Sequence, residues 1–157
     1  MSRHLKVNNE PITPTELEFL RQLVLRDSRF MIVGMVSAIL QGADSGTKDI
    51  DLWFETTSDG KLAEAARSLG GVFIWRADPP CLGGEGLERF DVVNYLHGLT
   101  SFADEYHDAL EMPIYDFSVK ILPLERVIAS KQAANRAKDK AALPALMAAL
   151  ASLRHIR

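Results

Sequence analysis

The amino-acid sequence predicts one α/β (α+β) domain over residues 1–157, in which helices flank a mixed β-sheet and further helices follow at the C-terminus. An apolar run passes through Gly34 into a short helical pattern, a β-favouring run covers 50–54, and helical periodicity fills 123–157. A length of 157 residues and 47% hydrophobic content suit a single domain with a sizeable core. We expect a core at about 25–122 and a C-terminal helical segment at 123–157.

Helices and strands alternate in the first half of the chain. The Thr-Pro-Thr-Glu run at 13–16 combines a capping box with proline at the first helical position, so a helix is predicted from there to about Asp27. The next predicted elements are a strand ending at Val33, a short helix before Gly42, a loop to Lys48, a strand over 50–54, a helix from Ser58 or Asp59 to Gly70, and a strand over Val72–Trp75.

The second half begins with a segment rich in turn residues. Two prolines and three glycines lie between Asp78 and Gly86, which predicts a mobile loop within the domain. Pro144 lies near the start of the last predicted helix, where proline is tolerated better than in mid-helix. The predicted elements are a strand over Leu87–Tyr95, a helix over Phe102–Leu110, one or two short strands within Ile114–Leu122, a helix from Pro123 to about Asn135, and a helix from about Asp139 to Leu153.

Two aspartates separated by one residue, Asp49 and Asp51, are the strongest chemical signal. On a strand, residues i and i+2 point to the same face with Cα atoms about 6.6 Å apart. Close carboxylates raise each other's pKa unless a cation lies between them, and oxygen-only anionic sites suit Mg²⁺. The alternative is a pair of solvated carboxylates at a strand edge.

Gly34 follows a short apolar strand and precedes a helical pattern. A helix start presents free backbone N–H groups, and a residue without a Cβ lets a ligand or a neighbouring backbone come close. This joint is therefore a candidate phosphate site, with a plain turn as the alternative.

Taken in order, Gly34, Thr47, Asp49 and Asp51 resemble the motif of the nucleotidyltransferase superfamily, particularly its small bacterial members, including the toxin-type nucleotidyltransferases. That pattern runs from a strand through Gly-Gly or Gly-Ser, a short helix and a loop often containing Thr to Asp-x-Asp on the next strand. The resemblance covers roughly residues 25 to 150.

The resemblance also implies a third carboxylate on a later strand. Asp91 is the best match, while Glu85 and Glu88 lie in glycine-rich surroundings that favour exposure to solvent. The run 124–139 is similar to the closing segment of these proteins, which carries a leucine–lysine–arginine–lysine–aspartate pattern. In this run, Lys131 is the match to the closing lysine.

The implied activity is a metal-dependent transfer of an NMP group from an NTP to a hydroxyl acceptor. Two Mg²⁺ (or Mn²⁺) ions would be held by Asp49, Asp51 and Asp91, and Asp91 would assist deprotonation of the acceptor. The acceptor is a protein, an RNA end or a small molecule. The implied nucleotide-binding residues are Gly34, Ser37, Thr47, Lys48 and Lys131.

One residue departs from the family pattern: Met35 stands where the family has Gly or Ser. A thioether cannot donate a hydrogen bond to a triphosphate. The alternative is therefore a nucleotidyltransferase fold with weak or no catalysis, acting as a nucleotide-binding protein or as a toxin–antitoxin component with an antitoxin-type protein partner. A weaker third reading is a metal-dependent sugar-nucleotide enzyme, for which the chain is short.

Lys131 also has an argument of its own. At about 100° per residue, it falls on the same helical arc as Leu124, Val127 and Ile128. An ammonium on a buried stripe either meets an anion, such as a triphosphate, a site aspartate or a structural carboxylate, or extends its head to water.

Other classes of protein are disfavoured. No apolar stretch approaches the roughly 20 residues that cross a bilayer, and the first residues lack an apolar signal core, so the cytoplasm is the expected location. Cys81 is the single cysteine, which excludes an internal disulfide. From Lys120 onward there are eight basic and two acidic residues, which is a basic segment but not a broad nucleic-acid platform.

Overall fold

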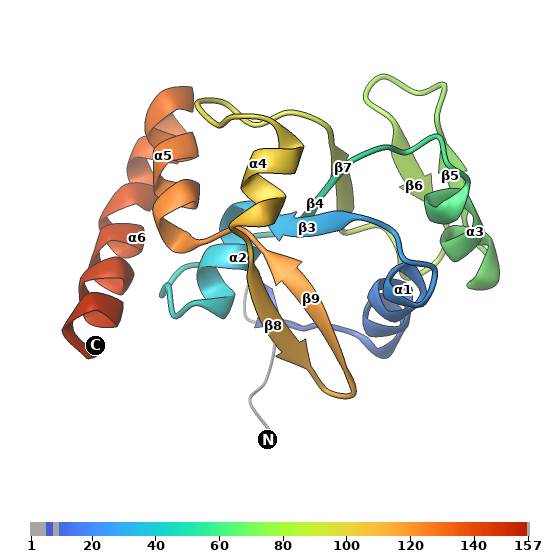
Figure 1. The fold of residues 1–157 in the computed structure, drawn as a ribbon, viewed down its shortest axis with the longest axis horizontal. Helices are drawn as coiled ribbons and strands as arrows, with labels where there is room; N and C mark the ends of the chain where they lie inside the picture. The colour runs from blue at the N-terminus through green and yellow to red at the C-terminus, as the bar shows by residue number, and fades with distance from the viewer. Residues whose placement is uncertain (1–5, 8–9, 157) are drawn as a thin grey trace.

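A seven-stranded mixed sheet forms the centre of the protein in the computed structural model, which describes residues 6–7 and 10–156 (Figure 1). Its strand order is β5-β6-β7-β4-β3-β9-β8; the β3/β9 and β4/β7 pairs are parallel and the other pairs antiparallel. The strands are β3 (Phe30–Val33), β4 (Ile50–Phe54), β5 (Val72–Ile74), β6 (Cys81–Gly83), β7 (Phe90–Val93), β8 (Leu110–Ile114) and β9 (Phe117–Ile121), with a separate pair formed by β1 (Lys6–Val7) and β2 (Glu10–Pro11).

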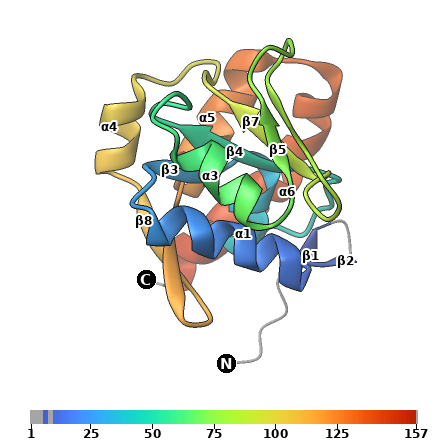
Figure 2. The same cartoon turned by 90° about the vertical axis from the view of Figure 1, so that its right-hand side faces the viewer.

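Helices cover both faces of this sheet, and the expected fold class is confirmed. The helices are α1 (Pro14–Leu25), α2 (Gly34–Leu40), α3 (Lys61–Ser68), α4 (Phe102–His107), α5 (Leu124–Ala134) and α6 (Ala137–Ile156). In Figure 2, α1 and α3 lie in front of the sheet, with α5 and α6 behind it. Within the described part of the chain, no helix has the length and apolar character needed to cross a membrane.

Alternation along β3 and β4 divides the apolar residues between two cores. Ile32 and Leu52 belong to the core beneath α1 and α3, whereas Met31, Val33 and Trp53 belong to the core beneath α5 and α6. Because side chains alternate along a strand, Asp51 lies on the same face as Trp53, beneath α5 and α6. The face of the sheet beneath α5 and α6 therefore carries Asp51.

The N-terminal helix is tied to the strand that carries Asp91. Thr13 and Glu16 form the predicted capping box. The buried Glu16 carboxylate also accepts hydrogen bonds from the Arg89 guanidinium, at 2.7 Å from Nη2 and 2.8 Å from Nε. Because Arg89 directly precedes β7, this pair joins α1 to the start of that strand.

The largest differences from the predicted elements occur at three places. The predicted mobile loop at 78–86 contains β6, which forms by pairing with β5 and β7, a contact that sequence periodicity does not report. The helix predicted over Phe102–Leu110 ends at His107, and Leu110 begins β8. The last helix begins at Ala137, so Pro144 lies inside it, on an exposed face.

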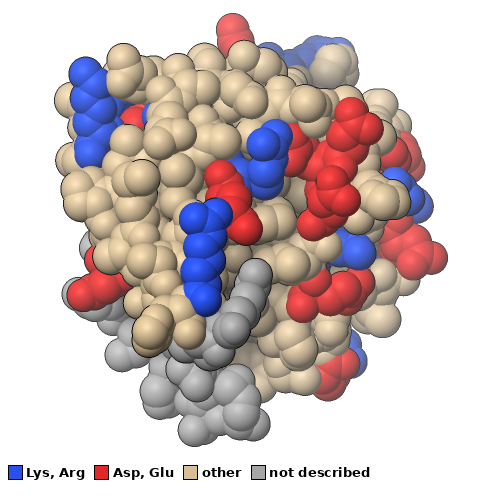
Figure 3. Space-filling model, turned by 60° about the vertical axis from the view of Figure 1, so that its left-hand side comes forward, with Lys and Arg blue, Asp and Glu red and all other residues tan. Residues whose placement is uncertain are grey.

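On the side formed by α5 and α6, the described lysine and arginine side chains are dispersed, and most of the surface is uncharged (Figure 3). Acidic side chains gather toward the right-hand edge of this view. The basic C-terminal segment expected from the sequence thus does not form a continuous patch on this face.

Candidate active site

Asp51 and Asp91 are direct neighbours on two adjacent parallel strands. The register pairs Asp51 of β4 with Asp91 of β7, and Asp51 also pairs with Val33, the last residue of β3. Neighbouring strands lie about 4.8 Å apart. Two carboxylates that are 40 residues apart in the sequence therefore project side by side, next to the point where β3 turns into α2.

The turn at Gly34 is built around Asp51. Gly34 has φ +65°, a left-handed conformation that favours glycine, and a Cβ at this position would lie 2.6 Å from Asp51 Oδ2. The absence of a side chain at Gly34 thus leaves the space that the Asp51 carboxylate occupies.

Asp49 completes the acidic cluster from the loop before β4. It is exposed, whereas Asp51 is partly buried. Its backbone N–H lies 3.4 Å from the hydroxyl of Thr47, so Thr47 shapes the loop that carries Asp49. Asp49 and Asp51 are two residues apart, as the Asp-x-Asp pattern requires, but only Asp51 belongs to the strand.

The electrostatics of the cluster are unfavourable for a protein without a cation. Burial, followed by the charges of Asp91 and Asp49, raises the pKa of Asp51 from 3.8 to about 6, against the opposing charges of Lys131 and Lys138. Burial and then the charge of Asp49 also raise the pKa of Asp91. The fold thus holds these acids where their ionised forms repel each other.

Lys131 lies on α5 above this cluster. Its Nζ is 3.4 Å from Oδ1 of Asp139, and 18% of its side chain is exposed. Its partner in the structure is thus a structural carboxylate, which was one of the alternatives for Lys131, although the sequence did not single out Asp139. Asp139 has no exposed surface, and it also binds the guanidinium of Arg136.

Two cavities flank Asp51 and Lys131. The first, about 340 Å³, we name the Asp91 cavity; it is lined by Gly34, Asp51, Asp91, Val93, Tyr95, Leu96, His97, Leu122, Val127, Ser130, Lys131, Ala134, Arg136, Lys138 and Asp139. The second, about 370 Å³, we name the Thr47 cavity; it is lined by Met35, Ser45, Gly46, Thr47, Asp49, Asp51, Lys131, Lys138, Ala141 and Ala142. Asp51, Lys131 and Lys138 form the wall between them.

Two of the residues expected to bind nucleotide lie elsewhere. Ser37 is buried, and its hydroxyl donates a hydrogen bond to the carbonyl of Leu122. We correct its role to a structural one, because this bond joins α2 to the segment that leads into α5. Lys48 is exposed and does not line either cavity.

Four further residues line these cavities but were not predicted from the sequence as site residues. Lys138 lines both cavities, and Tyr95, Arg136 and Asp139 line the Asp91 cavity. Arg136 follows the end of α5 and Lys138 lies in α6, so the apolar stripe that pointed to Lys131 gives no information on either residue. The spacing of Arg136 and Asp139, three residues apart at a helix start, is a capping signal that points to their pairing.

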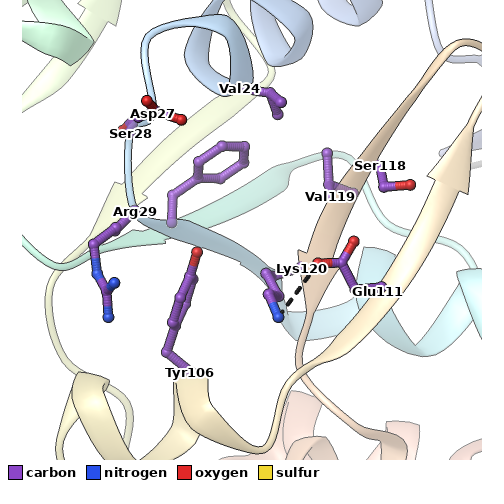
Figure 4. Close-up of a pocket in the computed structure, with 10 residues that line it drawn as sticks. Val24, Asp27, Ser28, Arg29, Tyr106, Glu111, Ser118, Val119 and Lys120 are labelled. Atoms are coloured by element: carbon purple, nitrogen blue, oxygen red, sulfur yellow. Dashed lines mark ion pairs between the residues drawn. The ribbon is translucent and has the colours of Figure 1, made fainter.

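A third cavity, of about 400 Å³, lies at the opposite end of β3 (Figure 4). Arg29 and Lys120 flank the Tyr106 ring, at 4.6 Å and 5.4 Å from its centroid, and Lys120 pairs with Glu111. None of the three site aspartates lines it. It is separate from the acidic cluster.

The acidic cluster fits a divalent cation in its chemistry. Its ligands would be carboxylate oxygens, which Mg²⁺ and Mn²⁺ prefer, and a cation would relieve the repulsion between Asp51 and Asp91. Among the described residues, no group of three His, Cys, Asp or Glu side chains already has the geometry of a metal site.

Comparison with known proteins supports the fold. No protein-family profile matches the chain, and no curated protein matches its sequence. Among solved structures, the chain is similar to the aminoglycoside nucleotidyltransferase ANT(2″)-Ia in complex with adenylyl-2″-tobramycin, with a TM-score of 0.56, 16% identity and 88% coverage of each chain. The fold is therefore nucleotidyltransferase-like.

Proposed function

We propose that the protein is a metal-dependent nucleotidyltransferase that moves an NMP group from an NTP to a hydroxyl acceptor. The observation that carries this proposal is the side-by-side placement of Asp51 and Asp91 on β4 and β7, with Asp49 two residues before Asp51. The cationic wall of Lys131 and Lys138 supports it, because a triphosphate needs counter-charges near the metal ligands. The likeness to ANT(2″)-Ia supports the fold on which the proposal rests.

Asp49, Asp51 and Asp91 would hold Mg²⁺ or Mn²⁺. When bound, such ions neutralise the transferring phosphoryl group and the leaving pyrophosphate. Asp91 is exposed to the Asp91 cavity and has a raised pKa, so its carboxylate suits a proton acceptor for the incoming hydroxyl. Lys131 and Lys138 would contact the triphosphate, and the turn at Gly34 leaves room for the Asp51 carboxylate.

The acceptor is a protein, an RNA end or a small molecule. It would enter through the Asp91 cavity, because its hydroxyl has to reach Asp91. The Thr47 cavity then receives the nucleotide. Met35 lies in the wall of that second cavity, where it offers no hydrogen bond to a phosphate.

Met35 favours a second candidate function, a nucleotide-binding protein with weak or no catalysis, including a toxin–antitoxin component with a protein partner. The two functions differ in one respect. Both predict metal-dependent NTP binding, but only the enzyme forms a covalent bond between the α-phosphate and an acceptor.

The test is transfer of label from each of the four α-³²P-labelled NTPs, with Mg²⁺ or Mn²⁺, to cellular RNA, to proteins and to a panel of small hydroxyl compounds. We expect labelled product with the wild type and at least a hundredfold less with Asp91→Asn, as is typical when a group that acts in the chemical step is removed. Asp44→Asn, an exposed aspartate that lines neither of the two cavities beside Asp51, is the matched control.

Undiminished labelling by Asp91→Asn would contradict the assigned role of Asp91. NTP binding without any labelled product would favour the non-catalytic alternative. Absence of NTP binding would contradict both.

A further inference from the structure

Among the residues that the structure describes, Asp139 is the single aspartate with no exposed surface, and it lies beside the proposed site. Arg136 donates to its carboxylate from Nε at 2.7 Å and from Nη2 at 3.2 Å. The backbone N–H of Arg136 donates to it at 3.0 Å, and the Lys131 ammonium lies 3.4 Å away. These partners lower the pKa of Asp139 to about 2, the Arg136 hydrogen bond being the largest cause, so it is ionised near neutral pH.

These contacts hold two lysines. Lys131 comes from the end of α5, and its ammonium is fixed against Asp139. Lys138 directly precedes Asp139 in the first turn of α6, whose start is set by the contact between Asp139 and the backbone of Arg136. Both lysines line both cavities beside Asp51. The buried Asp139 carboxylate thus fixes the side chain of Lys131 and the backbone next to Lys138.

We propose that Asp139 is a positioning residue for triphosphate binding: it holds the Lys131 ammonium at the wall between the Asp91 and Thr47 cavities. The inference rests on the proposed function. A free lysine side chain loses rotamer entropy when it binds a phosphate. The Lys131 side chain is only 18% exposed and already pairs with Asp139, so it has lost most of that rotamer freedom before the phosphate binds.

The opposite role would be competition. A carboxylate 3.4 Å from the ammonium also attracts it away from a phosphate. The two roles predict opposite changes in the contribution of Lys131 to triphosphate binding when Asp139 is neutralised. Under positioning, Lys131 contributes less to triphosphate binding after Asp139→Asn; under competition, Lys131 contributes as much or more.

A double-mutant cycle separates the two roles. Binding of the non-hydrolysable α,β-methylene analogues of ATP, GTP, CTP and UTP is measured by calorimetry with Mg²⁺, for the wild type, Lys131→Met, Asp139→Asn and the double variant. We expect Lys131→Met to weaken binding about tenfold to a hundredfold in the wild-type background, the value of a hydrogen bond to a charged group. In the Asp139→Asn background we expect less than about a threefold effect.

Glu105→Gln is the matched control. Glu105 is also buried, and the Arg126 guanidinium donates to it at 2.9 Å and 2.6 Å, but it lies on α4 and lines neither cavity beside Asp51. Both substitutions break the pairing of a buried carboxylate with a partly exposed arginine and are expected to lower the melting temperature. Only Asp139→Asn should change the effect of Lys131→Met, which a purely structural role of Asp139 would leave unaltered.

If Asp139→Asn does not fold, Asp139→Glu takes its place in the cycle, since it keeps the charge and moves the carboxylate by one methylene. The expected result is again a diminished effect of Lys131→Met. An undiminished effect in the folded variant overturns this inference and leaves the proposed function standing. Failure of the wild type to bind any of the four analogues overturns both.

Discussion

Replacing Asp51 with asparagine should stabilise the metal-free protein at neutral pH. The pKa of Asp51 is raised from 3.8 to about 6, first by burial and then by the charges of Asp91 and Asp49. Each pKa unit corresponds to about 1.4 kcal/mol, so keeping this group ionised in the folded state costs about 3 kcal/mol. Asparagine keeps the size of the side chain and removes the charge.

The pH dependence of this stabilisation follows from proton binding. Between pH 3.8 and about 6, the folded state binds the Asp51 proton more tightly than the unfolded state does, so the free energy of unfolding falls as the pH rises through this window. The asparagine variant lacks this fall. The asparagine variant should therefore be no more stable than the wild type near pH 4, and its gain in the free energy of unfolding should be complete above pH 7.

The assay is thermal unfolding in EDTA at pH 4 and at pH 7.5. For a chain of this length, about 3 kcal/mol corresponds to a gain of roughly 6–12 °C in melting temperature at pH 7.5. Adding Mg²⁺ and nucleotide should then stabilise the wild type and not the variant, because a ligand stabilises only the protein that binds it. A variant that melts below the wild type at pH 7.5, or a gain that is equal at both pH values, would refute the reasoning.

Three further substitutions test other parts of the site and fold. Gly34→Ala places a Cβ 2.6 Å from Asp51 Oδ2 at φ +65°, so we expect a lower melting temperature and loss of metal-dependent nucleotide binding by calorimetry; normal binding would contradict the role of this turn. Met35→Ser should tighten NTP binding about tenfold by adding a hydrogen-bond donor, and an unchanged affinity would show that this side chain points away from the phosphates. Glu16→Gln should lower the free energy of unfolding by about 1–3 kcal/mol in urea titrations, because it weakens the pairing of the buried Glu16 with Arg89, yet leave NTP affinity unchanged; lost affinity would show that this pair also shapes the site.

Local sequence signals predicted the elements that carry the acids. The capping box at Thr13 and Glu16 marked the start of α1, and β4 covers the predicted 50–54. The fold class could be predicted because alternation and helical periodicity follow from burial on one face. The nucleotidyltransferase-like fold needed the order of Gly34 and the Asp-x-Asp pair in addition to periodicity.

Contacts between distant segments could not be predicted in this way. The strand β6 lies in a stretch whose prolines and glycines signal turns, and it exists because β5 and β7 pair with it. Asp139 follows an exposed, charged stretch, and its spacing from Arg136 indicates a pairing at the helix start but does not indicate that the carboxylate is buried. Ser37 follows the glycine turn by three residues, but its hydroxyl donates a hydrogen bond to the carbonyl of Leu122, and it lines neither cavity beside Asp51.

The most direct test of the central claim is calorimetric titration of the wild-type protein with ATP, GTP, CTP and UTP, each in Mg²⁺ and in EDTA. Because Asp49, Asp51 and Asp91 repel one another without a cation, the triphosphate should bind only together with the metal. We predict that at least one NTP binds in Mg²⁺ and that none binds measurably in EDTA. Equal affinity in the two buffers, or no binding of any NTP in Mg²⁺, would contradict the account.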